Sequence, residues 1–296
     1  MLLLTGATGQ VGSALLRRLI DEGEDVRCLV RDPRRLGTMR VRVQIALGDL
    51  TDPPSFRNAL RGVDTVVHLA AAIRDQPRGS IEELNGIATW RLVRAAQNVG
   101  AKRFVFFSAL GASPHHRTRF HRAKALAEQA VRESDLDWTV LAPSLMYAPG
   151  DAWLTMLERL SLLPVMPVSG MGRALFQPIW AEDAAACAMA VLRDRSATPS
   201  GRRYELAGPQ TLTHLEIVAL VLETLQRPRP IVRVPTPIVS RVLRAMEAAL
   251  SQRAPVTWDE AELMECSMVA AAGASDAESL VAGLERMADV LDASGP

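Results

Sequence analysis

The sequence begins with the stretch Met1-Leu-Leu-Leu-Thr-Gly-Ala-Thr-Gly-Gln-Val-Gly12, which decides the fold. Its apolar first residues predict a short buried strand. The glycines Gly6, Gly9 and Gly12 then predict a sharp turn into an amphipathic helix from about residue 10 to 22. Because glycine has no side chain, backbone N–H groups of such a turn can approach a ligand closely, and a helix N-terminus favours a phosphate. Strand, glycine turn and helix together predict the pyrophosphate-binding opening of a dinucleotide fold.

The composition narrows the class of protein. The 296 residues are 48% hydrophobic and 23% charged, which is typical of a globular chain, and the net charge of +1 gives no reason to expect a nucleic-acid partner. The three cysteines, Cys28, Cys187 and Cys266, are far apart and odd in number, so we expect buried thiols and neither a disulfide framework nor a metal site. No apolar run reaches membrane-spanning length, and the strand at residue 2 leaves no room for a signal peptide. We therefore expect a cytoplasmic protein without a membrane span.

The first half of the chain alternates apolar strands with helices. Further strands are expected at 25–30, 41–47, 64–69, 103–107 and 138–141, and helices at 52–60, 81–99 and 119–133. Strands that alternate with helices at this spacing predict a parallel sheet covered on both faces. The expected fold class is α/β, with a Rossmann-type doubly wound parallel sheet and a smaller C-terminal α-rich lobe.

After Pro143 proline and glycine become frequent, and the helices are more loosely spaced. We expect a dinucleotide-binding domain at 1–143, with further sheet elements returning from about 174–208, and a smaller substrate or partner lobe at 144–296. Helices are expected at 181–193, 213–226 and 238–250, and from residue 275. The helix at 238–250 carries Arg241 and Arg244 opposite an apolar stripe, and we expect that stripe to pack on the core rather than on a membrane surface.

Taken together, these pieces resemble the short-chain dehydrogenase/reductase superfamily in its extended and atypical branches, which are NAD(P)-binding and epimerase/dehydratase-like. The resemblance covers residues 1 to about 235 and is most like the branch that contains the reductase-like accessory subunit of respiratory complex I and the NmrA-type proteins. The segments that carry it are 5–12, 48–50, 68–71, 106–109, 142–144, 177–178, 180–183 and 204–209. It implies the fold and the cofactor class but names no substrate.

The resemblance also implies which residues hold the cofactor. Asp49 would face the adenine, and the alanines after the fourth strand would line the ribose and pyrophosphate path. The full expected set is Gly6, Thr8, Gly9, Gln10, Val11, Gly12, Arg31, Asp49, Leu50, Ala70, Ala71, Ala72, Ser108, Lys124, Pro143 and Ser144.

The end of the second strand bears on the choice between NADP and NAD. An acidic residue at this position would bind the adenine ribose and select NAD, but the chain has Arg31 there, followed by Arg34 and Arg35. A planar guanidinium suits the 2′-phosphate of NADP. The adjacent Asp32 is able to serve a ribose, and a solvated loop is the alternative interpretation of the arginines. We expect NADP(H) to be preferred, with NAD(H) as the alternative.

The catalytic signature departs from the family. Superfamily enzymes place a tyrosine four residues before a lysine, so that both lie on one helix face and the lysine lowers the pKa of the phenol. Lys124 is in place, but the tyrosine position holds Phe120, which has no proton to give. Ser108 matches the serine that would polarise a carbonyl. Lys124 is either a ligand of the nicotinamide ribose or an ordinary solvated lysine.

Several residues are candidates to replace the phenol. The pair His115-His116 lies in the preceding loop, and His121 follows Phe120. Because adjacent helical residues point about 100° apart, we expect His121 to be a surface histidine. We expect Tyr147 to pack near the cleft rather than react, and His68 to be a satisfied core histidine.

Two functions follow from these observations. The first is an NADPH-dependent reductase of a small carbonyl or quinone, in which water or the substrate supplies the proton. The second is a non-catalytic protein that binds NADP(H) as a structural or redox-sensing ligand. Phe120 favours the second, whereas Ser108 and Lys124 keep the first open. The sequence predicts a dinucleotide as partner and indicates neither an oligomeric state nor a protein partner.

Overall fold

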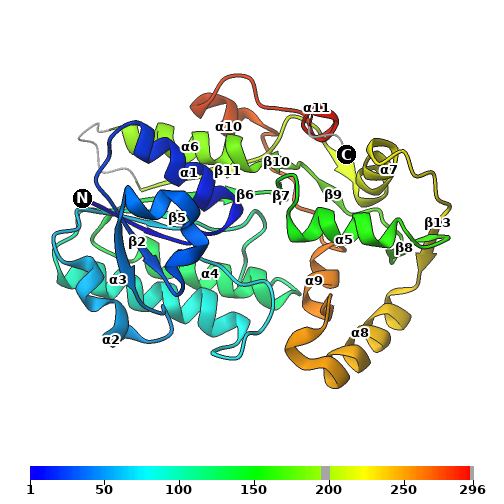
Figure 1. The fold of residues 1–296 in the computed structure, drawn as a ribbon, viewed down its shortest axis with the longest axis horizontal. Coiled ribbons are helices and arrows are strands. Elements are labelled where there is room, and N and C mark those ends of the chain that lie inside the picture. Colours follow the sequence, from blue (N-terminus) through cyan, green and yellow to red (C-terminus); the bar gives the residue numbers. More distant parts are fainter. Residues whose placement is uncertain (195–200, 294–296) are drawn as a thin grey trace.

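A computed structural model describes residues 1–194 and 201–293 (Figure 1). Its centre is a seven-stranded parallel sheet in the order β11-β6-β5-β4-β1-β2-β3. The strands are β1 (Leu2–Thr5), β2 (Val26–Val30), β3 (Gln44–Leu47), β4 (Thr65–His68), β5 (Arg103–Phe107), β6 (Asp137–Pro143) and β11 (Arg202–Leu206). The order reverses at β1, as in a doubly wound dinucleotide-binding sheet, so the expected fold class is confirmed.

The first strand shows why the apolar run is continuous. Leu2 and Leu4 pack into one apolar cluster, and Leu3 packs into another on the opposite face. Successive side chains of a strand point to opposite faces, so a strand covered on both faces needs apolar residues at every position.

Helices cover both faces of the sheet (Figure 1). The first cluster joins the sheet to α1 (Gln10–Asp21), α6 (Ala181–Arg193) and α10 (Ser275–Leu280). The second cluster joins it to α2 (Pro53–Phe56), η2 (Arg57–Leu60), α3 (Ala88–Asn98) and α4 (Arg119–Arg132). These layers leave the carboxyl ends of the strands as the edge at which a ligand site is expected.

The helix expected at 81–99 is present from residue 81 to 98, and it contains a π-helical turn, η3 (Glu83–Ile87), in which the buried Asn85 side chain bonds the backbone of Ala72. The third strand begins at Gln44 rather than at residue 41, because a 3-10 segment, η1 (Pro33–Val41), occupies the preceding residues.

A third apolar cluster lies beyond the sheet. It contains residues of α5 (Ala152–Leu160), α7 (His214–Thr224) and α11 (Met287–Ala293). Thr213 and Glu216 cap α7 reciprocally in a capping box. Short strand pairs connect these helices: β7 (Met146–Tyr147) with β10 (Ile179–Trp180), β9 (Leu175–Phe176) with β12 (Leu212–Thr213), and β8 (Met166–Ser169) with β13 (Ile231–Val234).

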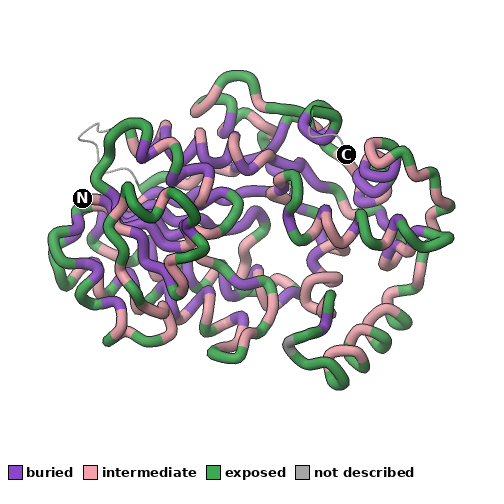
Figure 2. The backbone as a smooth tube through the Cα atoms, in the orientation of Figure 1, coloured by how far each residue is buried: buried purple, intermediate pink, exposed green. Residues whose placement is uncertain are grey.

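Helix α8 (Thr236–Leu250) contradicts the expectation that its stripe packs on the core. All of its 15 residues are described, and none is buried (Figure 2). The chain continues through η4 (Ser251–Arg253) to α9 (Trp258–Leu263), which turns back towards the sheet (Figure 1). Across the described ranges, no helix combines the length and apolar character that a membrane span requires.

Candidate functional site

Two of the three glycines in the first turn are required by the chain's own packing. Gly6 has a φ of +75°, and a Cβ there would lie 2.6 Å from the backbone nitrogen of Ala70. A Cβ on Gly12 would lie 2.1 Å from the carbonyl oxygen of Gly6. The turn is therefore pressed against the loop after β4 on one side and against its own helix on the other.

Gly9 differs from its neighbours. Its φ of −83° suits any residue, and the nearest atom to a Cβ built there is the Gly6 carbonyl oxygen at 3.3 Å. No side chain caps α1, so its first N–H groups face a cleft of about 420 Å³ lined in part by Gly9 and Gln10. The absent side chain leaves room for a ligand at a helix N-terminus, as a pyrophosphate requires. On this observation the turn fits a dinucleotide.

The arginines after β2 differ in what they contact. Arg34 forms an ion pair with Asp32, with Nε and Oδ1 3.0 Å apart, so this carboxylate already has a cationic partner. The exposed Arg31 donates to the side-chain oxygen of Gln76 at 3.1 Å, and among the described residues it has no ion-pair partner. Arg31 is thus a guanidinium available to a phosphate at the carboxyl end of β2.

Asp49 lies near Arg31. Burial alone would raise its pKa, but hydrogen bonds from Thr51 and Arg78 hold the pKa of this carboxyl below its usual value. The Arg78 guanidinium lies 3.0 Å from the carboxylate. Asp49 is therefore an anion at neutral pH, able to accept hydrogen bonds from a base or a ribose.

We predict that NADPH stabilises the protein more than NADH does, and that Arg31→Ala removes most of the difference. At a hundredfold excess over the dissociation constant, a ligand adds about 2.7 kcal/mol to the free energy of unfolding. Thermal midpoints with each cofactor measure the effect. Arg34→Ala is the matched control, because that guanidinium is bound to Asp32. Equal shifts with both cofactors in the parent protein would contradict the assignment of Arg31.

The loop after β4 is held from behind by buried polar groups. Asn85 accepts from the Ala72 nitrogen at 3.1 Å and donates to the Ala72 carbonyl at 2.8 Å. His68 lies 2.6 Å from the Thr5 hydroxyl and 2.9 Å from the Thr89 hydroxyl, and burial lowers its pKa to about 3. The prediction of a satisfied core histidine is confirmed. Ala70 to Ala72 consequently form a fixed wall facing the glycine turn.

Lys124 is buried at the carboxyl end of β5. Its side chain is 2% exposed, and Nζ donates to the Phe107 carbonyl at 2.7 Å. The ring centroids of Phe106 and Phe120 lie 4.9 and 5.7 Å from Nζ. Burial lowers the pKa of Lys124 to about 7, against a smaller opposing effect of Glu128. The alternative that Lys124 is an ordinary solvated lysine is therefore wrong.

We predict that Lys124→Met stabilises the protein at low pH. The folded chain binds this proton with a pKa of about 7 rather than 10.5, so below pH 7 the buried charge costs on the order of 4–5 kcal/mol. The cost decreases as the pH rises, to about 1 kcal/mol near pH 10, because the unfolded chain then loses the same proton. Urea unfolding of the parent and of Lys124→Met at about pH 6 and pH 10 measures the gain in stability. Lys102→Met, at an exposed lysine, is the control. A gain that is the same at both pH values would show that folding does not shift the pKa of Lys124.

Ser108 completes this end of the site. It follows β5, is 3% exposed, and its hydroxyl has no hydrogen-bond partner among the described residues. A buried hydroxyl without a partner costs free energy, which a ligand oxygen would recover. Ser108 and Lys124 thus fit the nicotinamide end of a dinucleotide, where they would hold the ribose and orient a substrate carbonyl.

The histidine beside Phe120 is not at the surface. His121 is buried, its Nδ1 lies 2.7 Å from the Thr118 hydroxyl, and its ring centroid lies 4.1 Å from that of His116. The prediction of a surface histidine is therefore wrong: the ring turns under the loop that precedes α4. Burial lowers its pKa to about 4, so the ring is neutral at pH 7 and holds no ready proton. His115 is exposed in the same loop.

Tyr147 is buried in the third apolar cluster. Its hydroxyl has no partner among the residues the structure describes, and burial, with Asp183 nearby, raises the pKa of the phenol above its usual value. A phenol with a raised pKa is a weaker acid than an exposed one. Tyr147 therefore packs, as predicted, rather than replacing the missing tyrosine.

Pro143 and Ser144 contact other parts of the chain. The Pro143 carbonyl accepts from the Leu110 nitrogen at 2.8 Å. The Ser144 hydroxyl donates to the Met268 carbonyl at 2.7 Å and accepts from the Gln177 nitrogen at 3.1 Å. Ser144 thereby fastens the C-terminal segment to the end of β6.

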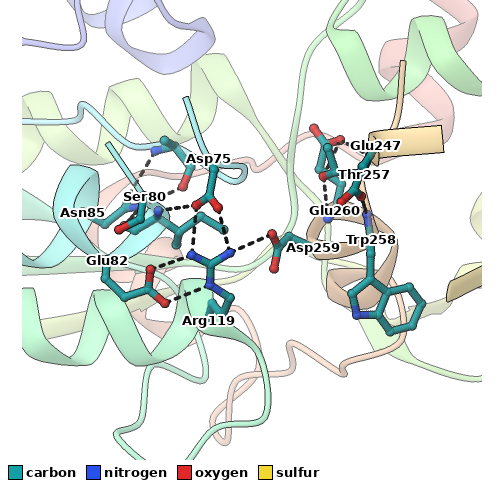
Figure 3. Close-up of polar contacts among 12 residues, drawn as sticks. Asp75, Ser80, Glu82, Asn85, Arg119, Glu247, Thr257, Trp258, Asp259 and Glu260 are labelled. Carbon is teal, nitrogen blue, oxygen red and sulfur yellow. Dashed lines mark hydrogen bonds and ion pairs between the residues drawn. The ribbon is translucent and has the colours of Figure 1, made fainter. Parts of the chain in front are cut away.

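Ion pairs tie α9 to the helix that carries Phe120 and Lys124 (Figure 3). Arg119 lies 3.2 Å from Asp259 and also pairs with Asp75 and Glu82. The Arg119 guanidinium lowers the pKa of Glu82 to about 2, whereas burial raises the pKa of Asp259. Two more pairs extend the contact: Arg74 lies 2.9 Å from Glu260, and Arg117 lies 3.3 Å from Glu265. The segment 254–266 is thus a strap across the start of α4.

This strap was not predicted from the sequence. Its partners are 140 to 186 residues apart, and each arginine by itself resembles a solvated surface residue. The pattern of apolar residues in the sequence does not indicate which charged residues form ion pairs. These pairs become visible only in the folded structure.

The expected cysteines are confirmed as free, buried thiols. Burial raises the pKa values of Cys28 and Cys187 to about 12, which leaves these thiols unreactive. Among the described residues, His, Cys, Asp and Glu side chains form no group of three or more that could hold a metal ion.

Comparison with known proteins agrees with this geometry. A family model described as NAD(P)H-binding matches residues 6–152. The NAD(P)H azoreductase of Xenophilus azovorans is 31% identical over 235 residues, which cover 77% of this chain and 75% of the relative. The chain belongs to the short-chain dehydrogenase/reductase superfamily, in its atypical branch. A mitochondrial NADH dehydrogenase subunit of Arabidopsis thaliana (alpha subcomplex subunit 9) is 30% identical over 79% of this chain and 60% of its own length.

This atypical short-chain dehydrogenase/reductase spans between about half and three quarters of the lengths of its first curated relatives. A solved structure of similar fold is the triphenylmethane reductase of Citrobacter sp. complexed with NADP(H), with a TM-score of 0.77. The match covers 99% of both chains at 18% identity, so it shows the fold alone.

Proposed function

We propose that this chain binds NADP(H) along the carboxyl edge of its sheet and reduces a quinone or a similarly conjugated acceptor. The observation that carries the proposal is the buried, unpartnered Ser108 hydroxyl at the end of the same strand whose carbonyl holds Lys124. A buried hydroxyl without a partner favours a ligand that supplies an oxygen to it. The site lies where the proposed dinucleotide domain, 1–143, meets the lobe 144–296.

The missing phenol favours a conjugated acceptor. When bound, NADPH supplies a hydride. A simple carbonyl that receives a hydride becomes a strongly basic alkoxide and needs an acid at once, but Phe120 provides none and His121 is neutral. A reduced quinone is a phenolate, far less basic, and takes its proton from water. Ser108 would donate a hydrogen bond to the acceptor oxygen, and Lys124 would hold the ribose.

The relatives support this class of acceptor. The Xenophilus azovorans relative is named an NAD(P)H azoreductase, and the Citrobacter neighbour a triphenylmethane reductase. Dyes of both kinds are conjugated, and the hydride enters an extended π system. For this chain the names support reduction of a conjugated acceptor.

The test is NADPH oxidation, followed by absorbance at 340 nm, with a panel of quinones, aldehydes and enones. We expect turnover with quinones and little or none with aldehydes. Ser108→Ala should lower the rate with quinones about tenfold or more, because one hydrogen bond to the developing oxyanion is lost. Aldehydes reduced as fast as quinones would contradict the proposal.

A non-catalytic NADP(H)-binding protein is the second candidate. Two observations favour it. Ser108 and Lys124 are almost completely buried, at 3% and 2% exposed. The described residues that line the cleft at the glycine turn include neither of them. A substrate therefore reaches them only if the side chains that cover them move. NADPH binding without turnover of any quinone would support this candidate over the first.

A further inference from the structure

The segment that leads into the strap, residues 226–258, is more positively charged than the rest of the chain. Between residues 226 and 258 it carries six arginines and a single acidic residue, Glu247, whereas the whole chain has a net charge of +1. Among the described residues, neither Arg233 nor Arg241 forms an ion pair. The segment is therefore rich in positive charge, and two of its arginines have no ion-pair partner among the described residues.

Helix α8, in the middle of this segment, exposes an apolar stripe. Ile238, Val242, Ala245 and Ala249 follow one another at intervals of four, three and four residues, so they lie on one face of the helix. All four are exposed; Ile238 is 50% and Val242 59% accessible. Leu250, at the end of the helix, is 46% accessible. A globular protein has no reason of its own to leave such a stripe in water.

The arginines border the stripe. Arg241 projects from the adjoining face of α8, Arg244 projects from between that face and the face that carries Glu247, and both arginines are exposed. The opposite face is held to the chain near its C-terminal end: Glu247 accepts from the backbone nitrogen of Trp258, and the Arg244 guanidinium lies 5.9 Å from the Trp258 ring centroid. The helix is thus anchored on one side and open on the other, at the margin of the molecule (Figure 1).

We propose that the outer face of α8 docks on an anionic phospholipid surface. An amphipathic helix of this kind lies in the plane of the interface, with its apolar stripe at the acyl boundary and its cationic side chains among the phosphates. The charge distribution selects this occupant over a second copy of the chain. In a symmetric pair the same patch would meet itself and bring like arginines together. The proposal does not depend on the proposed reductase function.

Sedimentation with lipid vesicles tests the proposal on the full chain. We expect binding to vesicles of equimolar phosphatidylcholine and phosphatidylglycerol, little binding to pure phosphatidylcholine, and release by salt. An arginine near an anionic surface contributes about 1 kcal/mol, so Arg241→Gln/Arg244→Gln should weaken binding about thirtyfold. Arg57→Gln/Arg94→Gln, with the same change in charge on exposed residues elsewhere, should bind like the parent.

A separate variant tests the contribution of the apolar stripe to vesicle binding. Val242→Asp should lower vesicle binding at least about tenfold and leave the thermal midpoint unchanged, because the side chain is exposed in the folded protein. Val99→Asp, also at an exposed valine, is the control. Equal binding to neutral and anionic vesicles, or none to either, would overturn the proposal. So would a dimer in solution that Val242→Asp dissociates, because α8 would then be an interface between copies.

Discussion

Phe120→Tyr is expected to give this protein aldehyde reductase activity that the parent lacks. The new hydroxyl lies four residues before Lys124 on the same helix face, and the ring it replaces is 5.7 Å from Nζ. Phe120 is partly exposed, so the added oxygen has room. General acid catalysis typically contributes about a hundred- to ten-thousandfold. NADPH oxidation with a tolerated aldehyde, at 340 nm, measures the gain, while rates with quinones should change far less.

Phe120→Leu is the matched control, because it alters the ring without adding a proton donor. If the parent already reduces aldehydes and Phe120→Tyr leaves the rate unchanged, the proton comes from another group. Tyr147→Phe and His121→Gln would then identify it, although both side chains are buried and His121 is neutral. That outcome would contradict the link between Phe120 and the acceptor class.

Gly9→Val is expected to abolish dinucleotide binding in a protein that still folds. The branched side chain would fill the open face at the start of α1, where the pyrophosphate must lie. At a hundredfold excess over the dissociation constant, NADPH should raise the midpoint of the parent by about 4 °C and that of the variant not at all. Circular dichroism confirms that the variant is folded.

Gly12→Val provides the contrast for that experiment. A Cβ there meets the Gly6 carbonyl oxygen at 2.1 Å, so this variant should be strongly destabilised even without a ligand. The two glycines belong to one motif, but Gly12 is required by the packing of the chain itself, whereas we expect Gly9 to be required by the ligand. A folded Gly9→Val protein with undiminished affinity for NADPH would mean that the phosphate site lies elsewhere.

The sheet was predictable because its signal is local. Strands buried on both faces must be apolar throughout, and the glycine turn needs a particular backbone, so both are visible in short windows such as residues 2–12. The resemblance to the superfamily implied Ser108 and Lys124 as site residues. Their burial was not predictable, because it depends on which side chains cover them.

The errors have a common cause. The stripe of α8 has the periodicity of a core helix, and periodicity alone cannot tell whether a partner surface exists. The position of His121 followed from its angle to Phe120 on an isolated helix, whereas the loop containing His116 folds over that face and buries the ring. Contacts between distant segments, such as Arg119 with Asp259, are likewise set by the fold rather than by spacing.

One measurement tests the central claim most directly. The stoichiometric complex of the parent protein with NADPH is mixed, without oxygen, with one equivalent of a quinone, and the absorbance at 340 nm is followed through a single turnover. The account predicts that the bound NADPH is consumed in the parent, more slowly in Ser108→Ala, and at no more than the rate in buffer with Gly9→Val. Bound NADPH that persists in the parent, or is consumed equally with Gly9→Val, would contradict a reductase built on the glycine turn and Ser108.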